Sequence, residues 1–403
     1  MSLNETPSSV RLHIGLFGRR NSGKSSLINA LTGQHIAIVS DVAGSTTDPV
    51  YKAMEFHGIG PVVFIDTAGI DDSGGLGRLR VAKTREAAEK TDVAIMVFNG
   101  EPRGEKPWID VLKSRGVPVI AVLNGIDAMT MGERGQALDA IRGACGLDAL
   151  PVSALTGEGL AELREKIVRE APGDDEAPSL TGTLCAAGDT VLLVMPQDIQ
   201  APKGRLILPQ VQVIRELLDK GCLPLCSTTD RAAQALSALK EPPALVIVDS
   251  QCFPAVAPLV PQGTRLTSFS VLFAGFKGDL AALVRGARVM PRLTEDSRVL
   301  IAEACTHVPL EEDIGRVKIP RLLRARFGKN LTVDFARGVD FPENLKVYDL
   351  IIHCGACTFN RRFMLSRIAR AAAAGVPITN YGLALAQLNG ILDKVSLPQE
   401  PQR

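Results

Sequence analysis

The stretch Gly18-Arg19-Arg20-Asn21-Ser22-Gly23-Lys24-Ser25 decides the fold of the first part of this chain. It follows an alternating, apolar run at 11–17 that predicts a strand, and it precedes a helical pattern at 26–31. In such a setting the glycines let backbone N–H groups wrap phosphate oxygens, the lysine reaches the β and γ oxygens, and the serine hydroxyl binds Mg²⁺. The sequence therefore predicts a phosphate-binding loop with contacts from Gly18, Asn21, Ser22, Gly23, Lys24, Ser25 and Ser26.

Polar motifs follow the next predicted strands and complete a nucleotide site. The strand pattern 62–66 ends in Asp66-Thr67-Ala68-Gly69, where a strand-tip carboxylate can hold the Mg²⁺ shell and a glycine can meet the γ-phosphate. The pattern 117–123 leads into Asn124-Gly125-Ile126-Asp127, and the last carboxylate can accept hydrogen bonds from a guanine edge. Ser153 and Ala154 follow one more strand-like piece. We predict that these residues converge on one nucleotide.

These five motifs resemble the signatures of the guanine-specific GTPases, in the branch that includes tRNA-modifying and ribosome-assembly members. The resemblance covers about residues 10–172 and implies hydrolysis of GTP to GDP with Mg²⁺. It assigns catalysis to Lys24, Thr46, Asp66 and Gly69, the Mg²⁺ to Ser25 and Thr46, and the base to Asn124, Asp127, Ser153 and Ala154.

Three details refine this resemblance. Asn21 and the segment 44–48 resemble the potassium-activated members, which implies a K⁺ ion held by Asn21. Ile70 stands where other GTPases have the glutamine that orients water, so we expect slow turnover. Gly125 replaces the lysine whose stem covers the base in the family, so we expect weaker guanine binding with specificity retained through Asp127.

Composition and net charge limit the kinds of binding partner and the cellular compartment that we expect for this chain. The 403 residues predict two or three domains, and a net charge of +1 provides no field that would draw the chain onto nucleic acid or a membrane. Neither a signal peptide nor an apolar run of membrane-spanning length is apparent, so we expect a cytoplasmic protein. In a reducing compartment the eight cysteines favour metal or redox chemistry over disulfides.

The predicted fold class is α/β, with a P-loop GTPase domain at 1–172 followed by two further α/β domains with mainly parallel sheets. The polar, proline-containing stretch 171–179 predicts the first boundary. We expect an assembly domain at 181–262, with strands near 191–195 and 244–249, and a third domain at 263–403. A third strand is expected at 267–273.

The third domain contains two segments rich in soft metal ligands. His353-Cys354-Gly355-Ala356-Cys357 follows a predicted strand, and Cys305-Thr306-His307 follows another. Because the carboxyl ends of parallel strands meet at one edge of a sheet, both segments are expected to contribute to one site. The alternatives are buried cysteines that only pack, and a structural zinc completed by His307 or His353.

The GTPase motifs, the middle α/β region and the pattern Cys-x-His…His-Cys-x-x-Cys together resemble the HydF family of [FeFe]-hydrogenase maturation GTPases over essentially the whole chain. The resemblance implies a dimerising middle domain and a [4Fe-4S] cluster on Cys305, Cys354 and Cys357, with His307 or His353 as a possible fourth ligand. It also implies a homodimer or higher oligomer that takes a two-iron precursor from radical-SAM maturases and delivers it to the apo-hydrogenase. A tRNA-modification or ribosome-assembly GTPase with a structural Cys₃His zinc site is the alternative.

Overall fold

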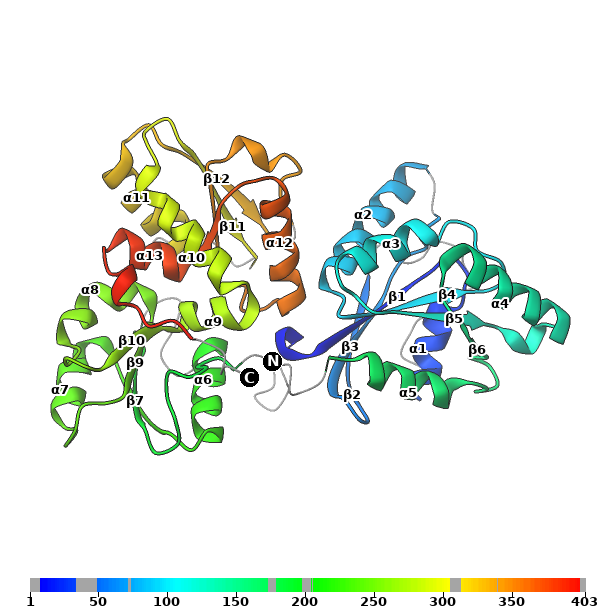
Figure 1. The fold of residues 1–403 in the computed structure, drawn as a ribbon, viewed down its shortest axis with the longest axis horizontal. Coiled ribbons are helices and arrows are strands. Elements are labelled where there is room, and N and C mark those ends of the chain that lie inside the picture. Colours follow the sequence, from blue (N-terminus) through cyan, green and yellow to red (C-terminus); the bar gives the residue numbers. More distant parts are fainter. Residues whose placement is uncertain are drawn as a thin grey trace. The chain divides into compact units, whose positions relative to one another are not determined.

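The computed structural model describes residues 8–33, 49–71, 74–172, 179–197, 204, 206–304, 313–338 and 340–398. The chain divides into two compact units, Met1–Glu176 and Ala177–Arg403. The described residues form three sheets, one in the first unit and two in the second (Figure 1). The predicted fold class, three α/β regions with mainly parallel sheets, is confirmed.

A six-stranded sheet forms the first unit, in the order β2-β3-β1-β4-β5-β6. All neighbours are parallel except β2 and β3. The strands are β1 (Leu12–Phe17), β2 (Val50–Phe56), β3 (Gly60–Asp66), β4 (Val93–Phe98), β5 (Val119–Asn124) and β6 (Leu150–Val152). The helices are α1 (Lys24–Thr32), α2 (Gly74–Lys90), α3 (Lys106–Ser114), α4 (Met131–Cys145) and α5 (Leu160–Glu170).

The side chains of β4 point alternately to the two faces of the sheet, and different helices cover each face. Its odd residues pack with α1 and α5 on one face, and its even residues pack with α2, α3 and α4 on the other. A strand that is buried on both faces is apolar at every position, which is why the run 93–98 carries no polar residue. The helices thereby leave the carboxyl edge of the sheet to loops.

Two four-stranded parallel sheets form the second unit. The first, ordered β10-β9-β7-β8, contains β7 (Thr190–Val194), β8 (Leu223–Ser227), β9 (Leu245–Val248) and β10 (Arg265–Ser268), with helices α6 (Leu208–Asp219), α7 (Ala232–Ser237), α8 (Phe253–Val256) and α9 (Phe269–Lys277). The second, ordered β12-β11-β13-β14, contains β11 (Arg298–Glu303), β12 (Thr332–Arg337), β13 (Leu350–His353) and β14 (Ile378–Asn380), with helices α10 (Leu280–Val289), α11 (Ile319–Phe327), α12 (Arg361–Ala373) and α13 (Tyr381–Leu388).

One continuous apolar core joins these two sheets. A single cluster of buried side chains runs from Leu192 in β7 to Val395 near the end of the described chain. In Figure 1, helices α9, α10 and α13 lie between the two sheets, and α9 and α10 both pack against α13. The second unit therefore folds as one body although it contains two sheets.

The expected strand at 267–273 is wrong. The structure ends β10 at Ser268 and begins α9 at Phe269, because the Ser268 hydroxyl accepts a hydrogen bond from the Val271 N–H and caps the helix. A short apolar run does not distinguish a buried strand from a buried helix. Since β10 pairs with β9, the middle sheet extends past the boundary expected between 262 and 263.

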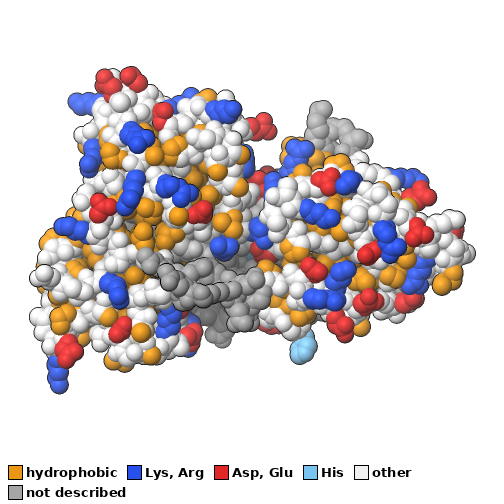
Figure 2. All heavy atoms as spheres, viewed as in Figure 1, with side chains coloured by type: hydrophobic (Ala, Val, Ile, Leu, Met, Phe, Trp, Pro, Cys, Tyr) orange, Lys and Arg blue, Asp and Glu red, His pale blue; other side chains and the backbone are white. Residues whose placement is uncertain are grey.

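Surface features match the balanced composition. Figure 2 shows Lys and Arg side chains interspersed with Asp and Glu over the visible face of both units. Among the residues that the structure describes, no helix is long and apolar enough to cross a membrane.

The edge strand β8, which the sequence pattern did not reveal, is only partly buried and contains Pro224.

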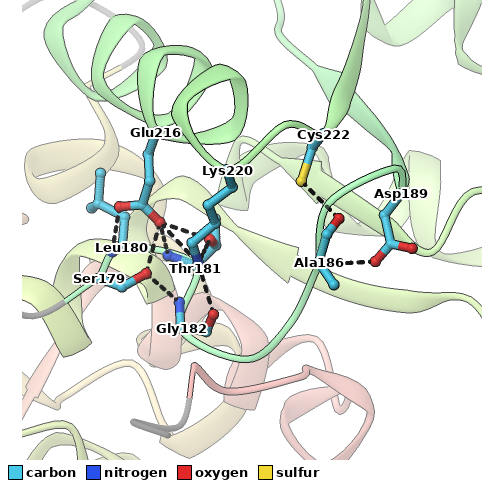
Figure 3. A network of polar contacts seen from close by, with 9 residues as sticks. All are labelled: Ser179, Leu180, Thr181, Gly182, Ala186, Asp189, Glu216, Lys220 and Cys222. Carbon is cyan, nitrogen blue, oxygen red and sulfur yellow. Dashed lines mark hydrogen bonds and ion pairs between the residues drawn. The ribbon is translucent and has the colours of Figure 1, made fainter.

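A half-buried carboxylate fixes the start of the second unit (Figure 3). Glu216 in α6 accepts hydrogen bonds from Ser179 Oγ at 2.9 Å, from Leu180 N–H at 2.6 Å, and from the N–H and hydroxyl of Thr181 at 2.8 and 2.7 Å. Lys220 Nζ, one helical turn later, donates to Thr181 Oγ1 and to the Gly182 carbonyl, both at 2.7 Å. These contacts hold the chain that follows residue 178 against α6.

We predict that Glu216→Gln lowers the stability of the second unit at neutral pH by about 1–3 kcal/mol, because charge-assisted hydrogen bonds are lost. Burial raises the pKa of Glu216, but the hydrogen bonds from Thr181, Leu180 and Ser179 outweigh it, and the net pKa lies below the ordinary 4.5. A depressed carboxyl pKa stabilises the fold at pH values above the ordinary value and ceases to do so as the pH falls through the folded value. Thermal unfolding of the wild type and of Glu216→Gln should therefore show a difference in stability that is constant near neutrality and shrinks below pH 4.5. A difference in stability that is independent of pH would contradict this account.

Candidate functional site

The predicted phosphate loop, residues 18–25, comprises the turn between β1 and α1 and the first two residues of α1. Lys24 is 7% exposed, and its ammonium group donates to the carbonyls of Gly18 at 3.0 Å and Arg19 at 2.8 Å. Those carbonyls hold a cation at the open end of the loop, where phosphate oxygens would bind. The structure thus places the Lys24 ammonium group within the predicted phosphate loop, and its contact with the β and γ oxygens stays a prediction.

Close backbone approach explains the glycines of the phosphate loop. A Cβ on Gly18 would lie 2.3 Å from the Val97 carbonyl oxygen, and one on Gly23 would lie 2.2 Å from Asn124 Nδ2. Asn21 adopts a left-handed conformation with φ of 59° and is exposed, a backbone geometry that asparagine tolerates better than most residues. The loop is thus shaped by backbone geometry rather than by side-chain packing.

Ser25 and Asp66, which the sequence predicts on the Mg²⁺ side of the site, contact each other. The Ser25 hydroxyl donates to Asp66 Oδ2 at 2.5 Å. Burial raises the pKa of Asp66, and the Ser25 hydrogen bond together with Lys24 and Lys52 opposes that shift. Thr46, the other expected ligand, lies outside the described residues.

Lys52 is a residue of this site that the sequence did not reveal. It lies in β2 at 7% exposure, and among the described residues its Nζ has no hydrogen-bond partner. Burial lowers the pKa of Lys52, and the neighbouring charge of Asp66 opposes the shift. Ser22 Oγ is likewise buried without a partner in the described part of the chain. Lys52 beside the half-buried carboxylate of Asp66, and Ser22 Oγ beside Gly18, are unpaired donors that suit the oxygens of a phosphate.

The segment after β3 contacts the phosphate loop directly. Ile70 N–H donates to the Gly18 carbonyl at 3.3 Å, and Arg20 N–H donates to Asp71 Oδ1 at 2.8 Å. A Cβ on Gly69 would lie 2.8 Å from Arg20 N, so a glycine is required at that crossing. Gly69 therefore lies where the sequence placed it, beside the phosphate loop.

The base side of the site follows β5 and β6. Asn124 Nδ2 donates to the Ser22 carbonyl at 3.2 Å, and Asn124 Oδ1 accepts from Ala154 N–H at 3.1 Å. Ser153 Oγ donates to Asp127 Oδ1 at 2.5 Å and orients that exposed carboxylate. These contacts bring together the predicted base-binding residues and join them to the phosphate loop.

The second unit carries a loop between β13 and α12, residues 354–360, which we call the cysteine loop. Cys354 Sγ accepts hydrogen bonds from Ala304 N–H at 3.1 Å and from Ala356 N–H at 3.4 Å. Cys357 Sγ lies 3.5 Å from the position of a Cβ on Gly355. The structure therefore turns both sulfurs toward the same short segment of backbone, and backbone N–H groups face one of them.

The other expected ligand segment is not described. Cys305 and His307 lie outside the described residues, so their expected place beside the cysteine loop stays a prediction. Within the described ranges, no three His, Cys, Asp or Glu side chains gather as a group that could hold a metal. The described chain before this segment stops at Ala304, whose N–H donates to Cys354 Sγ.

His353 is fully buried, and both of its ring nitrogens are engaged. Nε2 lies 2.9 Å from Arg367 Nη1, and Nδ1 lies 2.7 Å from the Cys354 carbonyl oxygen. Because the guanidinium group can only donate, Nε2 is the acceptor and Nδ1 carries the proton. Burial, reinforced by the charge of Arg367, lowers the pKa of His353 to about 3. The expectation of His353 as a fourth ligand is disfavoured, because ligation would break one of these buried contacts.

A polar group that the sequence did not reveal adjoins Cys354. Arg316 donates to Glu303 Oε2 through Nη2 at 2.6 Å and Nε at 3.0 Å, and Tyr381 Oη lies 3.5 Å from Glu303 Oε1. Burial and the neighbouring charges of Cys354 and Glu303 raise the pKa of Tyr381, so its phenol stays protonated. Glu303 is the last residue of β11, just as Asp66 is the last residue of β3. This shared position at the end of a strand is the sequence feature that could have identified Glu303 as a candidate site residue.

Of the five other described cysteines, four are buried and one is exposed. The buried ones are Cys145, Cys185, Cys222 and Cys252. Cys226 is exposed on the edge strand β8. None of these five belongs to a metal-binding group among the described residues.

Comparison with known families shows which proteins share this architecture. Residues 180–278 match the model of the hydrogen maturase F dimerization domain, and residues 281–398 match that of the hydrogen maturase F tetramerization domain. The chain belongs to the hydrogen maturase F family. Residues 13–125 match the model of the 50S ribosome-binding GTPase, so the chain contains a GTPase domain of that type.

Individual relatives match the GTPase domain. The chain is 37% identical over 164 residues to the tRNA modification GTPase MnmE of Paraburkholderia xenovorans, which covers 40% of this chain and 34% of that protein. It is 36% identical over 180 residues to the GTPase Der of Wolinella succinogenes, which covers 41% of this chain and 37% of that protein. The chain thus spans about a third of the length of these relatives. A solved structure of Era from Aquifex aeolicus is 21% identical, with a TM-score of 0.37, 61% of this chain covered and 97% of that chain.

We predict that Asp127→Asn weakens GTP binding on the order of 100-fold and improves binding of xanthosine triphosphate, since the new amide donates where the carboxylate accepted. Nucleotide competition measured by fluorescence would show the exchange of preference. Asp148→Asn, which alters an exposed carboxylate paired with Arg142 in the same domain, should change neither affinity. An unchanged preference in Asp127→Asn would mean that another residue reads the base.

Proposed function

We propose that this chain acts as a GTPase and a [4Fe-4S] scaffold that receives a two-iron precursor and delivers it to apo-[FeFe]-hydrogenase. The observation that carries the proposal is the cysteine loop, where Cys354 Sγ already accepts two backbone hydrogen bonds. Such N–H groups stabilise a thiolate over a thiol, and thiolates are the ligands that iron–sulfur clusters use. The GTPase domain in the same chain provides nucleotide-dependent control.

The residues of the first unit fit GTP and Mg²⁺. The glycine cradle of the phosphate loop, the buried Lys24 and the unpaired Ser22 hydroxyl suit the phosphates. Ser25 and Asp66 are oxygen ligands at hydrogen-bond distance from each other and would hold the metal shell. Mg²⁺ supplies charge neutralisation of the phosphoryl oxygens, while Lys24 positions the β and γ groups.

Potassium stimulation is the finer part of the GTPase proposal. Asn21 projects from the left-handed turn of the phosphate loop and is exposed, so its side-chain oxygen is accessible to a monovalent cation. The segment 44–48, from which the other oxygen ligands are expected, lies outside the described residues. The proposal therefore rests on Asn21 and on the resemblance to potassium-activated GTPases.

We predict that replacing Na⁺ with K⁺ at constant ionic strength raises the GTPase rate of the wild type, and that Asn21→Ala removes the stimulation. Phosphate release at saturating GTP and Mg²⁺ measures both effects. Lys24→Ala should abolish hydrolysis in either salt, because the β and γ oxygens lose their cation. Equal rates in Na⁺ and K⁺ would contradict the potassium claim and leave the GTPase intact.

The second unit fits a cluster with an incomplete set of protein thiolates. Cys354 and Cys357 are both half-buried, which leaves their sulfurs reachable from outside. Cys305 is proposed as the third thiolate. Because both nitrogens of His353 are engaged, the fourth iron takes His307 or a ligand from outside the chain. A replaceable position suits a protein that must attach and release a cargo, since ordinary electron-transfer clusters use four cysteines.

The family models describe how copies of the chain associate. A dimerization domain and a tetramerization domain together support a homo-oligomer. We propose radical-SAM maturases and the apo-hydrogenase as the further partners, in the cytoplasm, where reduced thiols persist. The proposed cargo, a two-iron unit, would leave through the replaceable position of the cluster.

We predict that Cys354→Ser and Cys357→Ser each abolish the [4Fe-4S] signal after anaerobic reconstitution and abolish hydrogenase maturation, because the remaining ligands hold iron poorly. Electron paramagnetic resonance of the reduced protein and an assay of the maturation of apo-hydrogenase provide the two readouts. Cys226→Ser, at the exposed thiol on β8, is the matched control and should change neither. A cluster that persists in Cys354→Ser would contradict the proposed site.

A further inference from the structure

We propose that Lys277 positions the cysteine loop and supplies the positive charge that a bound cluster meets. Lys277 is the last residue of α9 and is 1% exposed. It belongs to none of the sequence motifs described above. The electrostatic part of this proposal rests on the proposed function, whereas the positioning part concerns the protein alone.

All three donors of the Lys277 ammonium group are satisfied by one loop. Nζ donates to the carbonyls of Ala356 at 3.0 Å, Cys357 at 3.0 Å and Phe359 at 2.7 Å. A lysine has three N–H donors, so this geometry saturates it. The Phe273 ring lies 5.5 Å from the same nitrogen and adds a cation–π contact. The cysteine loop is thus wrapped around a single buried cation.

No regular secondary structure holds the cysteine loop between β13 and α12. Ala356 adopts a left-handed conformation with φ of 48°, which is strained for a non-glycine residue. That conformation needs compensation, and the hydrogen bonds from Lys277 to the carbonyls of Ala356 and Cys357 supply it. We therefore assign the shape of the loop to Lys277.

Ala356 links the Lys277 ammonium group to the Cys354 sulfur. Its carbonyl accepts from Lys277, and its N–H, which belongs to the preceding peptide, donates to Cys354 Sγ at 3.4 Å. Without the ammonium group the backbone at Ala356 is free to leave its left-handed conformation, and a carbonyl dipole directed at a thiolate would repel it. By holding the conformation of Ala356, Lys277 keeps this N–H, rather than a carbonyl oxygen, directed at Cys354.

The charge itself has a second consequence. A buried cation interacts strongly because the surrounding dielectric is low. Reduction adds negative charge to a cluster, so a cation held by its ligand loop favours the reduced state and raises the reduction potential.

Lys277 also connects two domains, because α9 lies in the residues that match the dimerization domain and the cysteine loop lies in those that match the tetramerization domain.

Two neutral variants separate position from charge. Lys277→Met removes the donors and the charge, whereas Lys277→Gln keeps two donors and loses the charge. Lys220→Met is the matched control, since it removes a partly buried ammonium group that donates to Thr181 and Gly182 in the same unit. All are prepared in the full-length chain, with far-ultraviolet circular dichroism and GTPase rate as checks of folding.

The first measurement is hydrogen–deuterium exchange of the metal-free proteins. We expect exchange at 354–360 to rise about tenfold or more in Lys277→Met and less in Lys277→Gln, with no change there in Lys220→Met, whose effect falls on 179–182. Unchanged exchange at 354–360 in Lys277→Met would overturn the positioning role. If Lys277→Met loses its fold, Lys277→Gln decides the question by the same criterion.

The second measurement is the reduction potential of reconstituted protein, followed by electron paramagnetic resonance. We expect both Lys277 variants to shift to a more negative potential by a similar amount, and Lys220→Met to match the wild type. Loss of the cluster from a folded Lys277 variant would also support the proposal, whereas an intact cluster at the wild-type potential would overturn the role of the charge. If the wild type itself binds no cluster, the proposed function fails, and the exchange measurement alone decides the role of Lys277.

Discussion

The ammonium group of Lys277, surrounded by three carbonyls of the cysteine loop, is the interaction on which the site in the second unit depends. A loop that must offer its sulfurs to a ligand cannot also bury them, so the stability of the loop has to come from its backbone. The first unit uses the same arrangement, since Lys24 is held by the carbonyls of Gly18 and Arg19. In both places a buried lysine gives shape to a loop that follows a parallel strand.

Both sites lie at the carboxyl edges of parallel sheets. The phosphate loop follows β1, the segment with Asp66 and Gly69 follows β3, and the base motif follows β5. In the second unit, Cys354 follows β13, which pairs with β11 just before the segment that carries Cys305. Helices cover the faces of such sheets, so the strand ends are where polar and reactive groups can converge. The continuous core of the second unit brings α9, from one sheet, within reach of the loop of the other.

Local patterns predicted the parts of the structure that depend on local chemistry. The phosphate loop needs glycines at fixed spacing because side chains would collide with Val97 and Asn124, so its sequence is diagnostic. The run 267–273 was misassigned because apolar residues alone do not distinguish a strand from a helix, and the cap at Ser268 settled it. Lys277 and Lys52 could not be recognised because, unlike Lys24, they are surrounded by residues that lie outside their own stretch of sequence. His353 was expected near the metal, yet Arg367, fourteen positions later, engages its ring.

The metal content of the anaerobically purified chain tests the central claim most directly. Iron, sulfide and zinc analysis combined with Mössbauer spectroscopy should show one [4Fe-4S] cluster per chain and no stoichiometric zinc, in a brown protein. A structural zinc site would use the same cysteines, with His307 as its remaining imidazole, because His353 is engaged. A colourless protein with one zinc per chain and no iron would contradict the account.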